Sequence, residues 1–208
     1  MSKNPDLDNA YAVSSQEEIK ELYRKWSYSY DTAFSEGQGY QLPREVANAF
    51  VSAGGLGPVL DVGAGTGLVG AALRKMNVPV VDGIDLSKDM LDVARMKGDY
   101  RGLHVRDVTQ TLDLVDAPYA GVVSSGTFTL GHVGPDALVH VFDVAASGAL
   151  LVISVNALHY VSAGFAAAFA DLESRMSQFE TRDVRIFDDR AADDHRMDMA
   201  KLAIFTKT

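Results

Sequence analysis

The stretch Val59-Leu-Asp-Val-Gly-Ala-Gly-Thr-Gly-Leu-Val-Gly70 decides the fold of this chain. Its first four residues predict a short buried strand, and the glycines after them predict a tight turn into a helix that begins at Leu68. Glycines between a strand and a helix let a ligand approach the backbone without meeting a Cβ atom, and the helix N-terminus offers free N–H groups. The stretch therefore predicts a ligand-binding loop at the edge of a sheet.

Strand and helix patterns alternate on both sides of this loop, from residue 57 to residue 155. The further strands are expected at 78–84, 103–105, 119–124 and 149–155, and the helices at 68–76, 87–98, 135–148 and 157–176. This alternation, with unbroken apolar strands, predicts an α/β fold with a doubly wound parallel sheet. Two later strands, at about 178–187 and 197–206, are joined by a short polar loop and should pair antiparallel.

The chain has 208 residues, which fits one structural domain. We divide it into a disordered lead (1–14), an N-terminal helical cap (15–55) and the α/β part (56–208). One cap helix runs to about residue 30, and a second opens at Pro43 and stops at Gly54-Gly55. The polar, acidic start is unlike a signal peptide, and no apolar run reaches membrane-spanning length, so we expect a cytoplasmic protein without membrane contact.

Composition excludes several function classes. The net charge of -9 disfavours a nucleic-acid surface, because phosphate binding depends on Lys and Arg. The chain has no cysteine, which excludes disulfides, Cys zinc sites and Cys nucleophiles. Its five histidines are scattered without metal-ligand spacing, so we expect no metal.

The glycine loop can be read in two registers. Gly65-x-Gly67-x-x-Gly70 fits a dinucleotide loop, which binds pyrophosphate. The longer string Asp61-x-Gly63-x-Gly65-x-Gly67 fits the loop that binds S-adenosylmethionine (SAM). Asp61 would repel a pyrophosphate, but it would attract the ammonium and sulfonium of SAM. This favours SAM over NAD, and a loop that binds nothing is the remaining alternative.

VLDVGAGTGLVG, followed by VDGIDLSKDMLDVA and RDV, resembles the class I SAM-dependent methyltransferases over about residues 20–175. SGTFTLGHVGPDAL resembles, more loosely, the methyltransferase-like group associated with the Williams–Beuren region. The resemblance implies a Rossmann-like seven-stranded sheet in the order 3-2-1-4-5-7-6, with strand 7 antiparallel. It also implies an enzyme that transfers the methyl group of SAM in line, by SN2, to an acceptor.

The same resemblance implies a set of cofactor contacts. Asp85 would accept hydrogen bonds from the ribose hydroxyls, and Asp107 would accept one from the adenine amine while the N–H of Val108 meets a ring nitrogen. Leu86 and Met90 would cover the adenine. Either Ser124 or Ser125 could meet the methionine part, or simply end the strand. The full set expected at SAM is Tyr30, Asp61, Gly63, Ala64, Gly65, Gly67, Asp85, Leu86, Met90, Asp107, Val108 and Ser124.

The acceptor side depends on fewer signals. His132, in a loop after the fourth strand, could act as general base, or it could be a structural histidine bonded to backbone. The pattern Tyr23-x-x-Trp26-x-x-x-Tyr30-Asp31 is similar to the leading helix that closes over SAM in many small-molecule methyltransferases. We expect the acceptor between residues 28–40, the 128–132 loop and the segment after Asn156. Asp82 is expected to be a solvated strand residue, and the acidic loop 188–194 a solvated turn.

The favoured function is methyl transfer to a small molecule, with His132 as the candidate catalytic residue. No Asn/Asp-Pro-Pro-aromatic motif follows the fourth strand, which argues against methylation of DNA bases or protein Gln. A protein or peptide acceptor is the alternative, and a SAM-binding protein without turnover is another. The sequence leaves open the oligomeric state and the acceptor atom.

Overall fold

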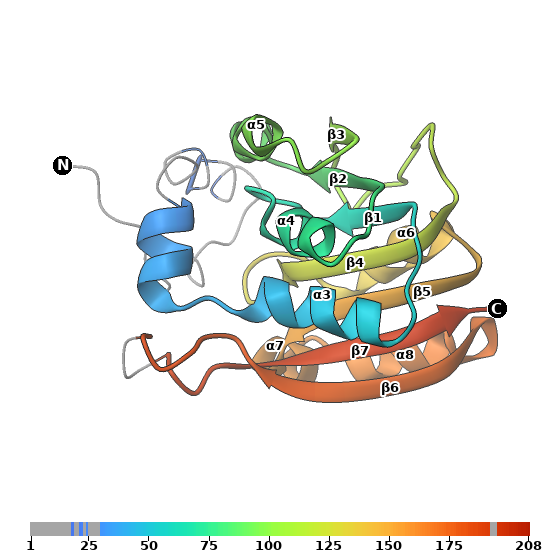
Figure 1. Cartoon of the computed structure of the whole chain (residues 1–208). Helices are drawn as coiled ribbons and strands as arrows, with labels where there is room; N and C mark the ends of the chain where they lie inside the picture. Colours follow the sequence, from blue (N-terminus) through green and yellow to red (C-terminus); the bar gives the residue numbers. More distant parts are fainter. Residues whose placement is uncertain (1–17, 19–20, 23, 25–29, 192–194) are drawn as a thin grey trace.

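A seven-stranded sheet organises the computed structural model, which describes residues 18, 21, 22, 24, 30–191 and 195–208 (Figure 1). Its strand order is β3-β2-β1-β4-β5-β7-β6, with β1 to β5 parallel and β7 antiparallel to both β5 and β6. This confirms the predicted order. The strands are β1 (Val59–Val62), β2 (Val81–Asp85), β3 (Gly102–Val105), β4 (Tyr119–Phe128), β5 (Ala145–Asn156), β6 (Met176–Arg185) and β7 (Met199–Lys207).

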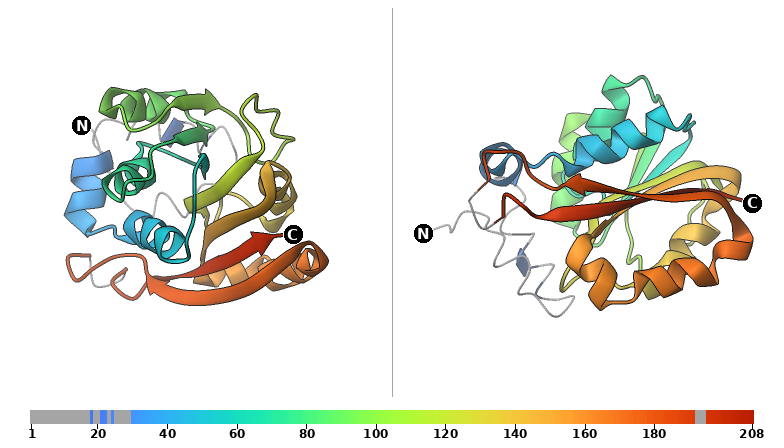
Figure 2. Two further views of the ribbon diagram at one scale, coloured as in Figure 1. Left: turned by 45° about the vertical axis from the view of Figure 1, so that its right-hand side comes forward. Right: turned by 90° about the horizontal axis from the view of Figure 1, so that it is seen from below.

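Helices cover both faces of the sheet. On one face lie α3 (Leu42–Ser52) and α4 (Leu68–Lys75), and on the other lie α6 (Leu138–Asp143), α7 (Ala157–Ser162) and α8 (Phe165–Asp171) (Figure 2). The helix α5 (Lys88–Lys97) packs on β2 and β3. Short turns of other helix types are η1 (Tyr30–Glu36), η2 (Pro135–Ala137) and η3 (Glu173–Arg175).

Successive residues of β1 enter different layers, because side chains alternate across a strand. Leu60 and Val62 belong to the apolar cluster beneath α6 and α8, and Val59 belongs to the cluster beneath α3 and α4. Asp61 therefore shares the α4 side of the sheet with Val59, and it is fully buried there. No helix of the described residues is long and apolar enough to cross a membrane.

Several predicted elements differ from the structure. The helix expected over 135–148 ends at Asp143, and β5 already begins at Ala145 rather than at 149. The single helix expected over 157–176 is broken into α7, α8 and η3, because Gly164 takes a left-handed conformation (φ 79°) between the first two. The hairpin strands begin at Met176 and Met199 rather than at 178 and 197. The predicted lead (1–14) and most of the first cap helix lie outside the described residues.

Asp82, expected to be solvated, is instead completely buried near the start of β2. The Arg101 guanidinium donates to both of its oxygens, and the Tyr119 hydroxyl donates to Oδ2 at 3.0 Å. Burial alone would raise the pKa of Asp82, but these hydrogen bonds outweigh it and hold the pKa below its ordinary value. The expectation was wrong because the partner is 19 residues away and only the β2–β3 pairing brings it near.

We expect Arg101→Met to lower the free energy of unfolding by about 2–3 kcal/mol at pH 7, because it leaves a buried carboxylate without its cation. This loss of stability is smaller than for a fully buried ion pair, since the Arg101 side chain is 44% exposed to solvent. A lowered pKa contributes stability above the unfolded value and loses it as pH falls. The difference from wild type in urea denaturation should therefore shrink below about pH 3.9. An equal difference at pH 7 and pH 3 would contradict this assignment.

Candidate active site

The glycine loop lies between β1 and α4 and forms the floor of a cavity at the carboxyl ends of the strands. The N–H groups of Gly63 and Ala64 both donate to the carbonyl of Ile84, at 2.8 and 2.9 Å, which fixes the loop to β2. Gly65 has a φ of 54°, which favours glycine, and a Cβ atom there would meet nothing within 4 Å. The backbone at Gly65 therefore faces open space that a ligand can enter closely.

Asp85 ends β2 on the cavity wall, and the loop itself orients its carboxylate. Gly65 N donates to Oδ2 and Ser87 N donates to Oδ1, both at 2.8 Å. Burial raises the pKa of Asp85, and these backbone donors oppose the rise. A carboxylate oxygen can accept two hydrogen bonds, so the Asp85 carboxylate retains capacity for a ribose hydroxyl beside its backbone donors.

The cavity continues to the residues expected at the adenine. Leu86, Met90, Asp107 and Val108 all line it. Asp107 follows β3, and its Oδ1 accepts from the N–H and the hydroxyl of Thr109, at 2.9 and 2.7 Å. The wall thus combines apolar surface with an oriented carboxylate, which suits a purine ring that carries an amino group.

Three residues expected at the cofactor do not line the cavity. Gly67 is buried as the N-cap of α4. Ser124 is fully buried, and its hydroxyl donates to the carbonyl of Val62 at 2.8 Å. An irregularity in the β4–β5 pairing follows Ser124, and Ser125, Gly126 and Thr127 reach the wall in its place. The structure therefore gives the position to Ser125, the alternative left open at the strand end.

Asp61 is the third of these residues, and it lies buried beneath the loop rather than on the wall. Its Oδ2 accepts a hydrogen bond from the Tyr100 hydroxyl at 2.6 Å. Its Oδ1 is buried without a hydrogen-bond partner among the described residues. Burial raises the pKa of Asp61 to about 7, the Tyr100 hydrogen bond opposes the rise, and the nearby charge of Asp85 adds to it. An orphaned acceptor and a raised pKa beside a glycine loop are typical of a functional group.

The opposite wall holds the residues expected at the acceptor. Tyr30, Tyr40, His132 and Val133 line the cavity, and Tyr28 lies outside the described residues. His132 Nδ1 lies 3.0 Å from the carbonyl of Leu130. A carbonyl only accepts, so Nδ1 carries the proton and Nε2 carries the lone pair of the neutral ring. Burial lowers the pKa of His132, which favours that neutral form at pH 7.

The segment after Asn156 adds no described residue to the wall, contrary to expectation. It acts on the site through His159, whose Nε2 donates to the carbonyl of Val133 at 2.9 Å. Asn156 accepts from the N–H groups of Leu158 and His159 and so begins α7. This segment supports the 130–133 loop from behind.

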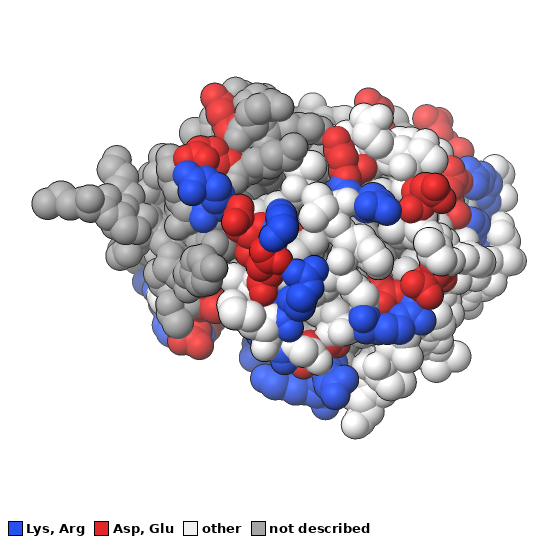
Figure 3. All heavy atoms as spheres, turned by 90° about the horizontal axis from the view of Figure 1, so that it is seen from above, with Lys and Arg blue, Asp and Glu red and all other residues white. Residues whose placement is uncertain are grey.

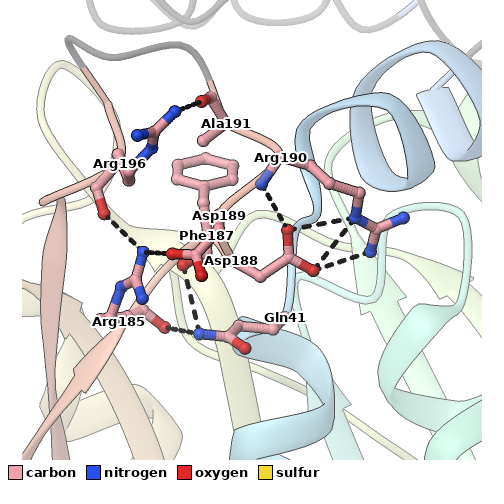
Figure 4. A network of polar contacts seen from close by, with 8 residues as sticks. All are labelled: Gln41, Arg185, Phe187, Asp188, Asp189, Arg190, Ala191 and Arg196. Atoms are coloured by element: carbon pink, nitrogen blue, oxygen red, sulfur yellow. Dashed lines mark hydrogen bonds and ion pairs between the residues drawn. The ribbon is translucent and has the colours of Figure 1, made fainter.

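The cap residues over the cavity are fixed at two points. Asp31 accepts from the Thr66 hydroxyl at 2.6 Å and forms an ion pair with Lys97, which joins the cap to the glycine loop and to α5. The second point is the loop after β6 (Figure 4). There the Gln41 side chain donates to the carbonyls of Arg185 and Phe187, at 3.3 and 3.2 Å.

The acidic loop after β6 is therefore more than a solvated turn. Arg190 forms an ion pair with Asp188 (Figure 4). It also donates to the carbonyl of Glu36 at 3.1 Å. Asp188 also packs so closely on Gly39 that a Cβ atom there would meet its carboxylate at 1.8 Å. Tyr40, between these contacts, is held over the cavity. No sequence motif indicates that Thr66 binds Asp31, that Tyr100 binds Asp61, or that the loop after β6 supports Tyr40.

Comparison with known proteins finds one matching family model and several similar folds. Residues 59–148, which include the glycine loop, Asp85 and Asp107, match a family described as "Methyltransferase domain". No curated protein matches the chain. The fold is similar to those of three solved structures of low sequence identity. The first is magnesium protoporphyrin IX methyltransferase from Synechocystis with bound SAM, which is 16% identical with a TM-score of 0.67 and covers 99% of this chain and 100% of that one. The second is a TehB-like SAM-dependent methyltransferase from Corynebacterium glutamicum, 20% identical with a TM-score of 0.64 and coverages of 93% and 100%. The third is a putative RNA methyltransferase from Pyrococcus horikoshii, 16% identical with a TM-score of 0.55 and coverages of 80% and 84%.

Asp85→Ala should weaken SAM binding by about 1.5–3 kcal/mol, roughly 10- to 150-fold, because hydrogen bonds to a charged carboxylate have this size. Isothermal calorimetry with SAM measures the effect, and NAD should not bind. Asp89→Ala is the matched control, since Asp89 is an exposed acid in the first turn of α5. Unchanged SAM affinity in Asp85→Ala, or binding of NAD, would contradict the assignment of this cavity.

Proposed function

We propose that the chain is a SAM-dependent methyltransferase that methylates a small molecule within the cavity described above. The match of residues 59–148 to a methyltransferase domain and the shared fold support this proposal. SAM, when bound, supplies an electrophilic methyl group on its sulfonium. In this proposal Asp85 holds the ribose, Asp107 and Val108 face the adenine, and Gly63, Ala64 and Gly65 carry the methionine part. Tyr30 and Ser125 contact SAM, and Tyr40 and His132 surround the acceptor. Charge from Asp61 below the loop favours the cationic end of SAM.

The observation that carries the proposal is that one cavity is lined by both groups of residues. Asp107, the glycine loop, Tyr40 and His132 all line it. An acceptor beside His132 would therefore share this cavity with the cofactor. Holding the two reactants in line is a main source of rate in such a transfer.

The roof of the cavity favours a small acceptor over a macromolecule. Tyr30 and Tyr40 line the cavity, and the contacts of the neighbouring Asp31 and Gln41 fix their segments. The chain carries a net charge of -9. On the face in Figure 3, acidic and basic side chains are intermingled and form no continuous basic surface. An RNA would require such a surface. The looser resemblance to the Williams–Beuren-associated group remains a prediction.

His132 is our candidate general base. With Nδ1 donating to the Leu130 carbonyl, Nε2 is the atom that would take the proton of an acceptor O–H or N–H as the acceptor gains the methyl group. The carbonyl also fixes the ring orientation, as a second partner does for catalytic histidines. A protein that only binds SAM would not need an oriented histidine beside its acceptor space.

A methyl-transfer screen tests the acceptor class. The purified protein is incubated with methyl-labelled SAM and a metabolite library, and in parallel with a peptide library and with RNA. We expect label in one or a few small molecules. Label only in peptides or RNA would overturn the small-molecule assignment, and no label in any arm, with SAM binding intact, would favour a binding protein without turnover.

Once the acceptor is identified, His132→Ala should slow turnover about 10²–10⁴-fold and leave SAM affinity unchanged, because it removes the proton acceptor alone. His140→Ala, a histidine of α6 outside the cavity wall, is the matched control. Burial lowers the pKa of His132 from its ordinary value of 6.5. As pH falls, the wild-type rate should therefore stay constant past pH 6.5 and decrease only at a lower pH. A His132→Ala enzyme with wild-type turnover would leave catalysis to alignment alone.

A further inference from the structure

Tyr100 occupies a position that no cofactor contact explains. It lies between α5 and β3, does not line the cavity, and yet touches three parts of the glycine loop region. Its hydroxyl donates to Asp61 Oδ2 at 2.6 Å and accepts from Gly70 N at 3.0 Å. One oxygen atom thus joins the end of β1 to the first turn of α4.

The acceptor role of this hydroxyl replaces a helix cap. Gly70 is the third residue of α4, so its N–H has no carbonyl partner within the helix. The N-cap residue Gly67 has no side chain that could accept from it. Tyr100 therefore holds the start of α4, while Asp61 fixes the direction in which the hydroxyl proton points.

The glycines of the loop leave the space that the Tyr100 ring fills. A Cβ atom at Gly70 would meet the ring at 2.3 Å, and Cβ atoms at Gly67 and Gly83 would each meet it at 3.0 Å. Three glycines from β2, the loop and α4 thus surround one aromatic side chain. Only the backbone at Gly65 is left facing open space among Gly65, Gly67 and Gly70.

We propose that Tyr100 is a positioning residue for the cofactor, which acts by keeping the buried Asp61 carboxylate oriented and negatively charged beneath the glycine loop. In this arrangement Tyr100 binds Oδ2, and the charge on Oδ1 has no donor within the described chain. That charge favours a ligand with a cationic end and disfavours an anionic one. The inference rests on SAM as the cofactor and not on the nature of the acceptor.

The titration of Asp61 gives the proposal a distinctive signature. Burial raises its pKa to about 7, and the Tyr100 hydrogen bond keeps the pKa from rising further. The other titratable groups of the described chain that interact with Asp61 are Asp85, whose charge raises its pKa, and Tyr40, which stays neutral because burial raises its pKa to about 12. Removing the Tyr100 hydroxyl should therefore leave Asp61 protonated over a wider pH range.

The test is a double-mutant cycle on SAM binding, measured by calorimetry with the full chain and no acceptor. We expect Tyr100→Phe to weaken SAM binding about three- to fivefold at pH 7, since a rise of one pKa unit would lower the ionised fraction of Asp61 from about one half to about one tenth. Asp61→Asn should weaken it at least as much. In the Asp61→Asn background, Tyr100→Phe should have a much smaller effect, because only the hydrogen bond from Gly70 N remains to be lost.

A pH series separates this role from a merely structural one. The loss caused by Tyr100→Phe should be largest near pH 7 and should shrink as pH rises and Asp61 ionises in both proteins. The SAM affinity of Asp61→Asn, measured over the same pH range, gives the change that comes from the titration of SAM itself. S-adenosylhomocysteine, which lacks the sulfonium charge, should lose less affinity than SAM in Tyr100→Phe.

Tyr119→Phe is the matched control, because Tyr119 is a buried tyrosine that donates to another buried aspartate, Asp82, near the start of β2. It should lower the melting temperature without changing SAM affinity. Additive losses in the double mutant, or a Tyr100→Phe loss that is equal at all pH values, would overturn the proposal. Because no acceptor is present, failure here would leave the small-molecule assignment untouched, and failure of the acceptor screen would leave this result untouched.

Discussion

The buried carboxylate of Asp61 is the constraint on which the site depends. A charge taken out of water costs several kcal/mol unless hydrogen bonds compensate it. Here one tyrosine supplies a hydrogen bond to one oxygen, and the other oxygen has no partner among the described residues. The tyrosine ring in turn requires glycine at 67, 70 and 83. The fit of Gly70 to a dinucleotide pattern thus has a different cause: Gly70 makes room for an aromatic ring, not for a pyrophosphate.

Two buried aspartates on the neighbouring strands β1 and β2 have different surroundings, although they lie only one register position apart. In β2, Asp82 receives hydrogen bonds from Arg101 and Tyr119, and its pKa is lowered. In β1, Asp61 has Tyr100 alone, and its pKa is raised to about 7. The satisfied carboxylate contributes to stability, whereas in our proposal the unsatisfied one retains interaction energy for a ligand.

The sequence predicted those features that depend on local pattern. The strand alternation, the glycine loop and the helix cap at Ser87 follow from spacing alone, and the structure has each of them. Features that depend on contacts between distant residues were not predictable. Tyr100 lies 39 residues from Asp61, and Arg101 lies 19 from Asp82. Local pattern also could not decide between Ser124 and Ser125. A break in the β4–β5 register, which the sequence does not show, determines which of the two side chains faces the cavity.

The segment that carries Tyr40 on the cavity wall is also fixed by contacts with residues that are distant in sequence. Gln41 binds the carbonyls of Arg185 and Phe187, which are 144 and 146 residues further along the chain. The Tyr40–Phe187 bridge and the Arg190–Glu36 hydrogen bond fasten the same segment. No described residue of the β6–β7 hairpin lines the cavity, and yet this hairpin fixes the height of Tyr40 above it. The hairpin that completes the sheet therefore also fixes a residue of the cavity wall, although no described residue of the hairpin belongs to that wall.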